Sequence, residues 1–294
     1  MYLIHQPTVN KILKTLFLPF REFVPAKYQF AVEGDVDVQL SPDKAIKVTG
    51  NITSPISRML YWGGTSAFEP EEFKFFTQII KNCKVMFDIG SNIGYYSLVA
   101  KRYNPSIKVV AFEPLPSVYD FLNKNIALNG FENVKTERIA LSNETGNASF
   151  HVRINPRMKD AAQLPGDSSL DASQLDSATM VKVEVQTETL DNYVAQNLKA
   201  GEKIDFIKID TEATEHLVFQ GGAEVLKTHR PIIMCEVIKD KIQLELEKIF
   251  SQYDYRYYRI AGTKLQRYDH LVVDKPKEDY FLVPTEKAHL VDNL

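Results

Sequence analysis

The stretch VMFDIGSNIGYYSL, residues 85–98, joins two apolar runs of different period. Residues 85–89 are apolar apart from Asp88, which is typical of a buried strand. From Gly94 onward the apolar residues recur at helical spacing. A strand-to-helix turn needs one glycine at most, so Gly90 and Gly94 beside Asp88 indicate that some group approaches this backbone closely.

The segments that follow repeat the alternation of strand and helix. Residues 107–113 and 133–141 are expected strands, and the helix between them is expected to begin at Pro116 and to end at Asn129-Gly130. This βαβαβ order predicts an α/β fold with a parallel sheet and right-handed crossovers. Further along, the pattern predicts helices near 189–198, from about 212 and near 240–250, strands at 204–210 and 231–237, and closing antiparallel strands at 253–260 and 280–284.

One segment interrupts this alternation. Residues 146–154 and 179–187 both have the pattern of strands, and no helix is expected between them. We therefore expect a β-hairpin insert over about residues 143–187. Its polar tip, residues 155–177, is expected to act as a lid over the second substrate.

Composition excludes several classes of protein. The chain has 294 residues, 44% of them hydrophobic, and a net charge of −3, so a basic nucleic-acid-binding surface is not expected. Cys83 and Cys235 are its only cysteines, which excludes a disulfide framework and favours a reducing cytoplasm.

Residues 1–65 are expected to form a helical extension that packs on a domain comprising residues 66–294. The extension has neither the basic start and cleavage site of a signal peptide nor the ~20 apolar residues of a transmembrane segment. Five apolar residues of the extension share one helical face, which is expected to pack on the domain: Ile12, Leu13, Leu16, Phe17 and Phe20. Because residues 1–30 carry four Lys/Arg and one Glu, the alternative is a helix that binds a membrane surface or a partner, which includes a second copy of the chain.

The spacing of the glycines and of the acid that follows them indicates which class of ligand binds at this turn. A dinucleotide fingerprint has a glycine where this chain has Asn92, and that glycine lets a pyrophosphate contact the backbone. Glu113 ends the second strand, 19 residues after Gly94, where an acid accepts hydrogen bonds from ribose hydroxyls. Asp88 can accept a hydrogen bond from an ammonium group. A ribose and an ammonium without phosphates indicate S-adenosylmethionine rather than a nicotinamide cofactor.

In combination these motifs resemble the FkbM-type family of S-adenosylmethionine-dependent methyltransferases, in order and spacing, from about residue 65 to 285. The matching segments are AFEPEEFKFF (67–76), VMFDIGSNIGYYSL (85–98), VVAFEP (109–114), NKNIALNGFENV (123–134), IALSNETGNASF (139–150), ETLDNY (188–193), IDFIKIDTEATEHLVFQGGAEVL (204–226) and PIIMCEV (231–237). The family usually reads KIDVEGAE where residues 208–215 read KIDTEATE. Ala213-Thr214 therefore replaces a Gly-Ala pair, which bears on the substrate more than on the cofactor.

The resemblance implies a Rossmann-like class I methyltransferase fold, with a mostly parallel seven-stranded sheet, a reversed seventh strand and helices on both faces. It implies methyl transfer to a small hydroxylated acceptor, such as a sugar, a polyketide or another secondary metabolite. Carried over by position, the cofactor residues are Asp88, Gly90, Ser91, Asn92 and Gly94 at the methionine end, Glu113 and Pro114 at the ribose, Ala140, Leu141 and Ser142 at the adenine, and Glu69 and Asp210 nearby.

A hydroxyl acceptor must lose a proton, so a base or a metal is expected beside the methyl group. The candidate catalytic residues follow two strands: Asp210, Glu212, His216 and Glu236. Together with Glu215, Glu212 and His216 are expected on one helical face, and His216 has the most suitable unperturbed pKa. Alternatively, Asp210 positions the acceptor, or the carboxylates of Asp210, Glu212 and Glu236 hold Mg²⁺, which is possible but not expected.

Three other functions remain open from the sequence. They are a nucleotide-dependent oxidoreductase, a non-catalytic module that binds the cofactor, and a methyltransferase that acts on nitrogen or carbon. The missing glycine at position 92 disfavours the first. An N-methyltransferase of this class often carries an Asn/Asp-Pro-Pro-aromatic turn after the fourth strand, and the chain has none, so oxygen is the expected acceptor atom.

Overall fold

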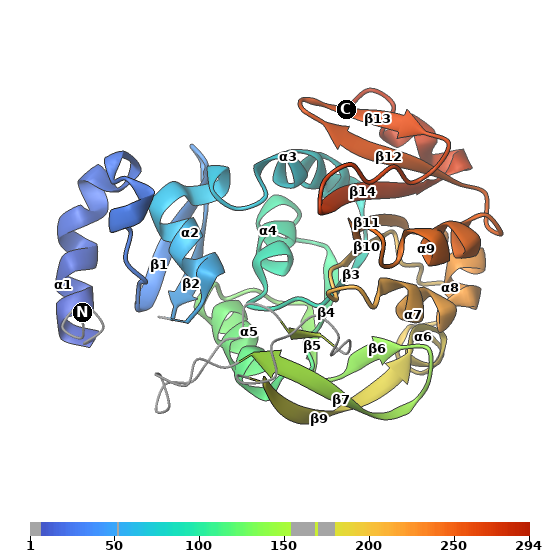
Figure 1. The fold of residues 1–294 in the computed structure, drawn as a ribbon, viewed down its shortest axis with the longest axis horizontal. Helices are drawn as coiled ribbons and strands as arrows, with labels where there is room; N and C mark the ends of the chain where they lie inside the picture. The colour runs from blue at the N-terminus through green and yellow to red at the C-terminus, as the bar shows by residue number, and fades with distance from the viewer. Residues whose placement is uncertain (1–6, 52, 154–167, 170–179) are drawn as a thin grey trace.

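The computed structural model describes residues 7–51, 53–153, 168–169 and 180–294. Eight strands of these residues form the main sheet, in the order β13-β12-β14-β11-β10-β3-β4-β5 (Figure 1). Their bounds are β3 Val85–Ile89, β4 Lys108–Phe112, β5 Val134–Glu137, β10 Phe206–Ile209, β11 Ile232–Ile238, β12 Tyr255–Ala261, β13 Lys264–Tyr268 and β14 Lys277–Pro284.

The strand directions confirm the class I arrangement. The five strands from β5 to β11 are parallel, and β14 runs antiparallel between β11 and β12, which is the reversed strand that the resemblance implied. The sequence analysis did not predict β13. This eighth strand returns from β12 through a turn at Gly262, whose φ is +62°, and it pairs with the exposed edge of β12.

Helices cover both faces of the sheet, as expected. One face carries α3 (Pro70–Ile79), α4 (Tyr95–Tyr103) and α5 (Pro116–Leu128), with the 3₁₀ segment η5 (Ile80–Asn82) after α3. The other carries α6 (Leu190–Asn197), α7 (Glu215–Gln220), α8 (Ala223–Thr228) and α9 (Gln243–Phe250). The 3₁₀ segment η8 (Thr285–Leu290) follows β14.

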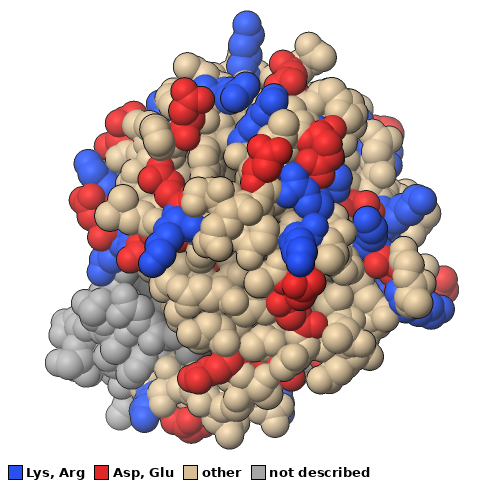
Figure 2. Space-filling model, turned by 90° about the vertical axis from the view of Figure 1, so that its right-hand side faces the viewer, with Lys and Arg blue, Asp and Glu red and all other residues tan. Residues whose placement is uncertain are grey.

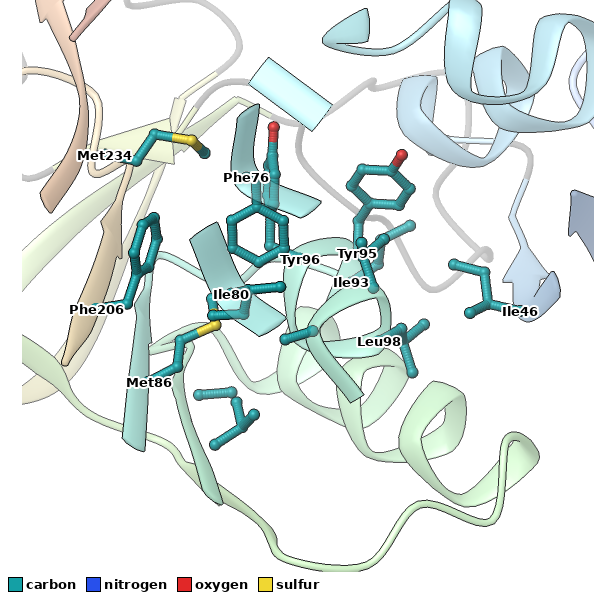
Figure 3. Packing of buried hydrophobic residues seen from close by; sticks show 14 of the residues in the cluster. Ile46, Phe76, Ile80, Met86, Ile93, Tyr95, Tyr96, Leu98, Phe206 and Met234 are labelled. Atoms are coloured by element: carbon teal, nitrogen blue, oxygen red, sulfur yellow. The ribbon is translucent and has the colours of Figure 1, made fainter. Parts of the chain in front are cut away.

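Alternate residues of each strand enter two separate cores. Met86 and Phe206 point to the side of α3 and α4, where Figure 3 shows them near Phe76. The next residues along these strands, Phe87 and Ile207, enter the core under α6 to α9. Burial on both faces explains why these strands appear in the sequence as continuous apolar runs.

The insert forms a second sheet, in the order β6-β9-β7-β8. Its strands are β6 Ala140–Ser142, β7 Gly146–Arg153, β8 Ser168–Ser169 and β9 Met180–Thr189. The antiparallel pairing of β7 with β9 confirms the predicted hairpin. The single strand expected at 133–141 is wrong: β5 ends at Glu137, and β6 leaves the main sheet to pair with β9. Apart from residues 168–169, the predicted lid lies outside the described residues.

The N-terminal region is less helical than expected. It contains α1 (Pro7–Phe17), the 3₁₀ segments η2 (Leu18–Phe23), η3 (Ala26–Tyr28) and η4 (Gly64–Ser66), a hairpin of β1 (Gly34–Ser41) and β2 (Lys44–Gly50), and α2 (Pro55–Gly63). The hairpin packs on α5: Asn125 Oδ1 accepts from Thr49 N at 2.7 Å, and Asn129 Oδ1 accepts from Lys47 N at 2.8 Å. The domain boundary at residue 65 stays a prediction.

None of the helices in the described ranges combines the length and the apolar character that crossing a bilayer requires.

Candidate functional site

The turn after β3 is held in left-handed backbone, with φ of +74° at Gly90, +50° at Asn92 and +85° at Gly94. A Cβ added to Gly90 would lie 1.9 Å from the carbonyl oxygen of Asp210, just beyond the neighbouring β10. A Cβ added to Gly94 would lie 2.6 Å from Cδ1 of Leu122 in α5. The close approach expected from the sequence is therefore made by the protein itself, since β10 crowds Gly90 and α5 crowds Gly94.

Glu113, directly after β4, holds this turn in place. Its Oε2 accepts from the backbone N of Asn92 at 3.1 Å, and its Oε1 accepts from the backbone N of Leu115 at 3.0 Å. Burial raises the pKa of Glu113 to about 7. A carboxylate has about four acceptor positions, so each oxygen keeps capacity for a further donor.

Asp88 ties β3 to the first turn of α4. Its Oδ2 accepts from Ser97 N at 3.0 Å and from Ser97 Oγ at 2.6 Å. Burial raises the pKa of Asp88 to about 6, and the bonds from Ser97 oppose that rise. An acid here also faces the positive end of the helix dipole, which stabilises its ionised form.

A buried lysine, Lys208, lies close to several acids. The side chain of Lys208, in β10, is 6% exposed, and its Nζ lies 3.2 Å from Asp210 Oδ2. Burial lowers the pKa of Lys208, but Asp210, Glu69 and Asp279 outweigh burial and raise it. Glu69, at the start of α3, in turn accepts a hydrogen bond from the hydroxyl of Tyr96.

Glu212 lies in the turn between β10 and α7, where Glu212 and Ala213 have φ of +54° and +73°. Burial raises the pKa of Glu212 to about 8, and repulsion from Asp210 and Glu236 adds to the rise. Glu236, in β11, is ion-paired with Lys277 of β14. Lys208 and Lys277 thus compensate a group of carboxylates that would otherwise repel one another.

One cavity of about 290 Å³, at the carboxyl ends of β3, β4 and β10, is lined by Glu69, Asp88, Glu113, Lys208, Asp210, Glu212 and Lys277. In a doubly wound sheet this is the end at which ligands bind. Further polar lining comes from the turn of residues 90–93. The apolar lining includes Pro55, Ile56, Met59, Phe68, Ile139, Ala140, Leu141 and Phe150.

Most of the predicted cofactor residues line this cavity: Glu69, Asp88, Gly90, Ser91, Asn92, Glu113, Pro114, Ala140, Leu141 and Asp210. Gly94 and Ser142 are not among the lining residues. Gly94 faces α5, as shown by the position of Leu122. Ser142 packs against the turn between α7 and α8. A Cβ added to Gly221 in that turn would lie only 2.2 Å from the carbonyl oxygen of Ser142.

Some of the predicted catalytic residues line the cavity and others do not. Asp210 and Glu212 line the cavity, whereas Glu236 and His216 do not. The expected helical face is wrong, because the left-handed backbone at Glu212 delays the start of α7 until Glu215. Burial lowers the pKa of His216, and the charge that opposes this shift is Glu245 of α9, so His216 lies towards α9.

The sequence analysis missed Lys208, Lys277 and Tyr96, which also line the cavity. For Lys208 a signal was available, since it is the one charged residue inside the apolar run of residues 206–209. Lys277 belongs to a strand that follows its neighbour β11 by 39 residues, and sequence spacing does not predict that pairing.

The three carboxylates considered for Mg²⁺ do not fit a metal site. Within the described ranges, no three His, Cys, Asp or Glu side chains are grouped as metal ligands. Lys208 and Lys277 instead lie against Asp210 and Glu236.

Comparison with known proteins gives the same family as the motifs. Residues 88–257, more than half of the chain, match the family model described as the methyltransferase FkbM domain. Methyltransferase sdnD of Sordaria araneosa is 31% identical over 162 residues, which are 47% of this chain and 60% of that protein. The 31-O-demethyl-FK506 methyltransferase FkbM of Streptomyces tacrolimicus is 26% identical over 155 residues, 47% of this chain and 58% of that protein.

The chain thus spans about three fifths of the length of these curated relatives. Among solved structures, methyltransferase FkbM of Methylobacillus flagellatus KT has a TM-score of 0.43 and 14% identity, covering 67% of this chain and 43% of that one. The matched residues 88–257 include the glycine turn, Glu113 and the acids after β10. The chain belongs to the FkbM methyltransferase family.

Proposed function

We propose that this protein is an S-adenosylmethionine-dependent O-methyltransferase that acts on a hydroxyl group of a small molecule. The observation that carries the proposal is the cavity, in which the glycine turn, Glu113 and a set of acids meet at the carboxyl end of a class I sheet. The name of the relative from Streptomyces tacrolimicus, a methyltransferase for a 31-O-demethyl compound, supports oxygen as the acceptor atom.

The charge of the cavity supports this cofactor over a dinucleotide. Of the described residues that line it, the acids are Glu69, Asp88, Glu113, Asp210 and Glu212, and the bases are Lys208 and Lys277. Such an excess of acids attracts a cation and repels the pyrophosphate of a nicotinamide cofactor. S-adenosylmethionine has no phosphate and carries two positive groups.

The lining residues divide among the parts of the cofactor. Glu113 retains acceptor capacity for the two ribose hydroxyls, and Ala140 and Leu141 supply apolar contact for the adenine. The turn of residues 90–92 and Asp210 are assigned to the methionine end. When bound, the cofactor supplies a methyl group on a sulfonium, which is electrophilic.

Glu212 is the group that we assign to the acceptor's proton. It lines the cavity next to Asp210, and its pKa of about 8 suits a base that works near neutral pH. Asp210, paired with Lys208, is assigned to hold the acceptor hydroxyl in place. His216 does not line the cavity, so we no longer assign it the role of base.

Calorimetry with S-adenosylhomocysteine and with NAD tests the cofactor assignment. We expect the first to bind and the second not to bind. Glu113→Gln should weaken binding by ~10-fold or more, because charge-assisted hydrogen bonds are worth ~1.5–3 kcal/mol each. The exposed Glu144→Gln is the matched control. Equal affinity in wild type and Glu113→Gln, or measurable binding of NAD, would contradict the assignment.

The acceptor atom is tested separately. Labelled S-adenosylmethionine is incubated with the protein and with matched pairs of small molecules that carry either a hydroxyl or an amine, and the products are analysed by mass spectrometry. Transfer to hydroxyls supports the proposal. Transfer to amines alone would identify an N-methyltransferase.

A further inference from the structure

Helix α1 packs on the protein through polar side chains. Asn10 is fully buried, its Nδ2 donates to Ala31 O at 2.7 Å, and its Oδ1 accepts from Glu33 N at 2.9 Å. One turn later, Lys14 Nζ donates to Glu33 O at 3.1 Å and to Asp35 O at 2.6 Å. The inner face of the helix is thus tied to the chain before and within β1 by hydrogen bonds.

The apolar residues of this segment face away from the protein. Ile12 is 56% exposed and Leu16 is 64% exposed, on the side of α1 opposite Asn10. In η2, Phe20 and Phe23 are 64% and 82% exposed. The expectation that this face packs on the domain is therefore wrong for Ile12, Leu16 and Phe20. Phe17 does contact Phe30 and Trp62 with its ring.

This exposure is concentrated in one place. Of the eleven large hydrophobic side chains that are exposed among the described residues, seven lie between residues 12 and 28: Ile12, Leu16, Phe17, Leu18, Phe20, Phe23 and Tyr28. Single exposed hydrophobic residues need no explanation, but a set confined to 17 consecutive residues marks an interaction surface. Figure 1 places α1 at the end of the long axis opposite to β12 and β13.

The same segment is basic. Residues 7–28 carry Lys11, Lys14, Arg21 and Lys27 against the single acid Glu22, a net charge of +3 in a chain whose net charge is −3. The opposite end of the molecule, shown in Figure 2, has basic and acidic side chains interspersed. Lys14 is tied inward by its bonds to Glu33 and Asp35, so the exposed lysines next to these apolar residues are Lys11 and Lys27.

We propose that residues 12–28 dock this protein on the surface of an anionic lipid bilayer, with α1 and η2 lying in the plane of the interface. Exposed leucine, isoleucine and phenylalanine side chains enter the acyl boundary, while the exposed Lys11 and Lys27 meet acidic headgroups. A symmetric pair of copies joined through this segment would bring the same positive charges together, which disfavours self-association.

Vesicle co-sedimentation tests the apolar contribution. The full chain is mixed with vesicles of phosphatidylcholine alone or with ~30% phosphatidylglycerol, and we expect binding that is stronger to the anionic vesicles. The double variant Phe20→Ser/Phe23→Ser should bind at least ~10-fold more weakly, because each inserted aromatic side chain contributes that order of affinity. The control is Leu244→Ser in α9, which removes a side chain that is 74% exposed elsewhere.

The double variant Lys11→Gln/Lys27→Gln tests the charge. Each lysine near an anionic surface is worth ~5-fold in binding, so this variant should lose most of the preference for phosphatidylglycerol. All variants should bind S-adenosylhomocysteine like wild type, because none of the changed residues lines the cavity. Absence of vesicle binding, or equal binding by wild type and Phe20→Ser/Phe23→Ser, would overturn the proposal. A dimer in light scattering that Phe23→Ser dissociates would assign the surface to a second copy.

Discussion

Gly90→Ala tests whether the glycine turn is set by the contact between β3 and β10. Alanine in left-handed backbone costs ~1–2 kcal/mol. Its Cβ would also lie 1.9 Å from the carbonyl oxygen of Asp210, which is backbone and cannot rotate away. Relief requires the end of β10 to move, which strains the hydrogen bond from Asp210 N to Ile89 O, 3.0 Å long and worth ~1 kcal/mol. With ~1–3 kcal/mol for overpacking, we expect a loss of roughly 4 kcal/mol in the free energy of unfolding.

Gly130→Ala separates the cost of left-handed backbone from the cost of the clash with β10. Gly130 has a similar φ of +61°, but no atom beyond its chain neighbours lies within 4 Å of its added Cβ, so only the backbone cost of ~1–2 kcal/mol is expected. Urea unfolding of both variants, followed by circular dichroism, gives the comparison. Gly90→Ala should also lose affinity for S-adenosylhomocysteine, because Asp210 moves. Equal destabilisation by the two substitutions would refute the reasoning.

Three further predictions concern the acids of the cavity. Affinity for S-adenosylhomocysteine should rise from pH 6 to pH 8, with proton release in calorimetry, because burial raises the pKa of Glu113 to about 7 and the ligand favours its ionised form; a pH-independent affinity would contradict this. Without ligand, the raised pKa of Glu113 contributes at most about 3 kcal/mol to the free energy of unfolding, in full below about pH 4.5. This contribution is lost as the pH rises through 7, so less urea should then unfold the protein. Glu113→Gln should make stability depend less on pH over this range. Glu212→Gln should lower kcat by ~10²-fold or more with unchanged cofactor binding, whereas His216→Ala should stay near wild type; the reverse result would restore histidine as the base.

The strands that build the cavity were predictable because they are buried on both faces. Mostly apolar runs bounded by Gly90, by Pro116 and by the acids after residue 209 identify β3, β4 and β10. Asp88, Glu113 and Asp210 then follow from the rule that parallel strands end at one edge. These residues are close in space because neighbouring strands place them there, and the sequence contains that information locally.

Features that depend on contacts between distant segments were not predictable. The start of α7 depends on left-handed backbone at Glu212 and Ala213. A sequence rarely predicts this conformation at residues other than glycine. Gly94 has the right spacing for a ligand contact, yet Leu122 of α5 explains it. Likewise, the outward face of α1 follows from Asn10 and Lys14, whose partners lie 19 or more residues away.

Lys208 accounts for the presence of so many carboxylates in one cavity. Burying an unpaired charge is costly, and like charges side by side raise one another's pKa until they are neutral. A lysine inside β10 is fixed by the sheet on both sides, so its charge cannot leave the site as that of a surface lysine could. Its nearest carboxylate, that of Asp210, lies 3.2 Å away. Glu212 has Lys277 nearby, but burial and the repulsion from Asp210 and Glu236 outweigh it and leave a raised pKa. The lysine in β10 thus gives two neighbouring acids different environments, and this difference is the basis on which we propose Asp210 as the positioning group and Glu212 as the proton acceptor.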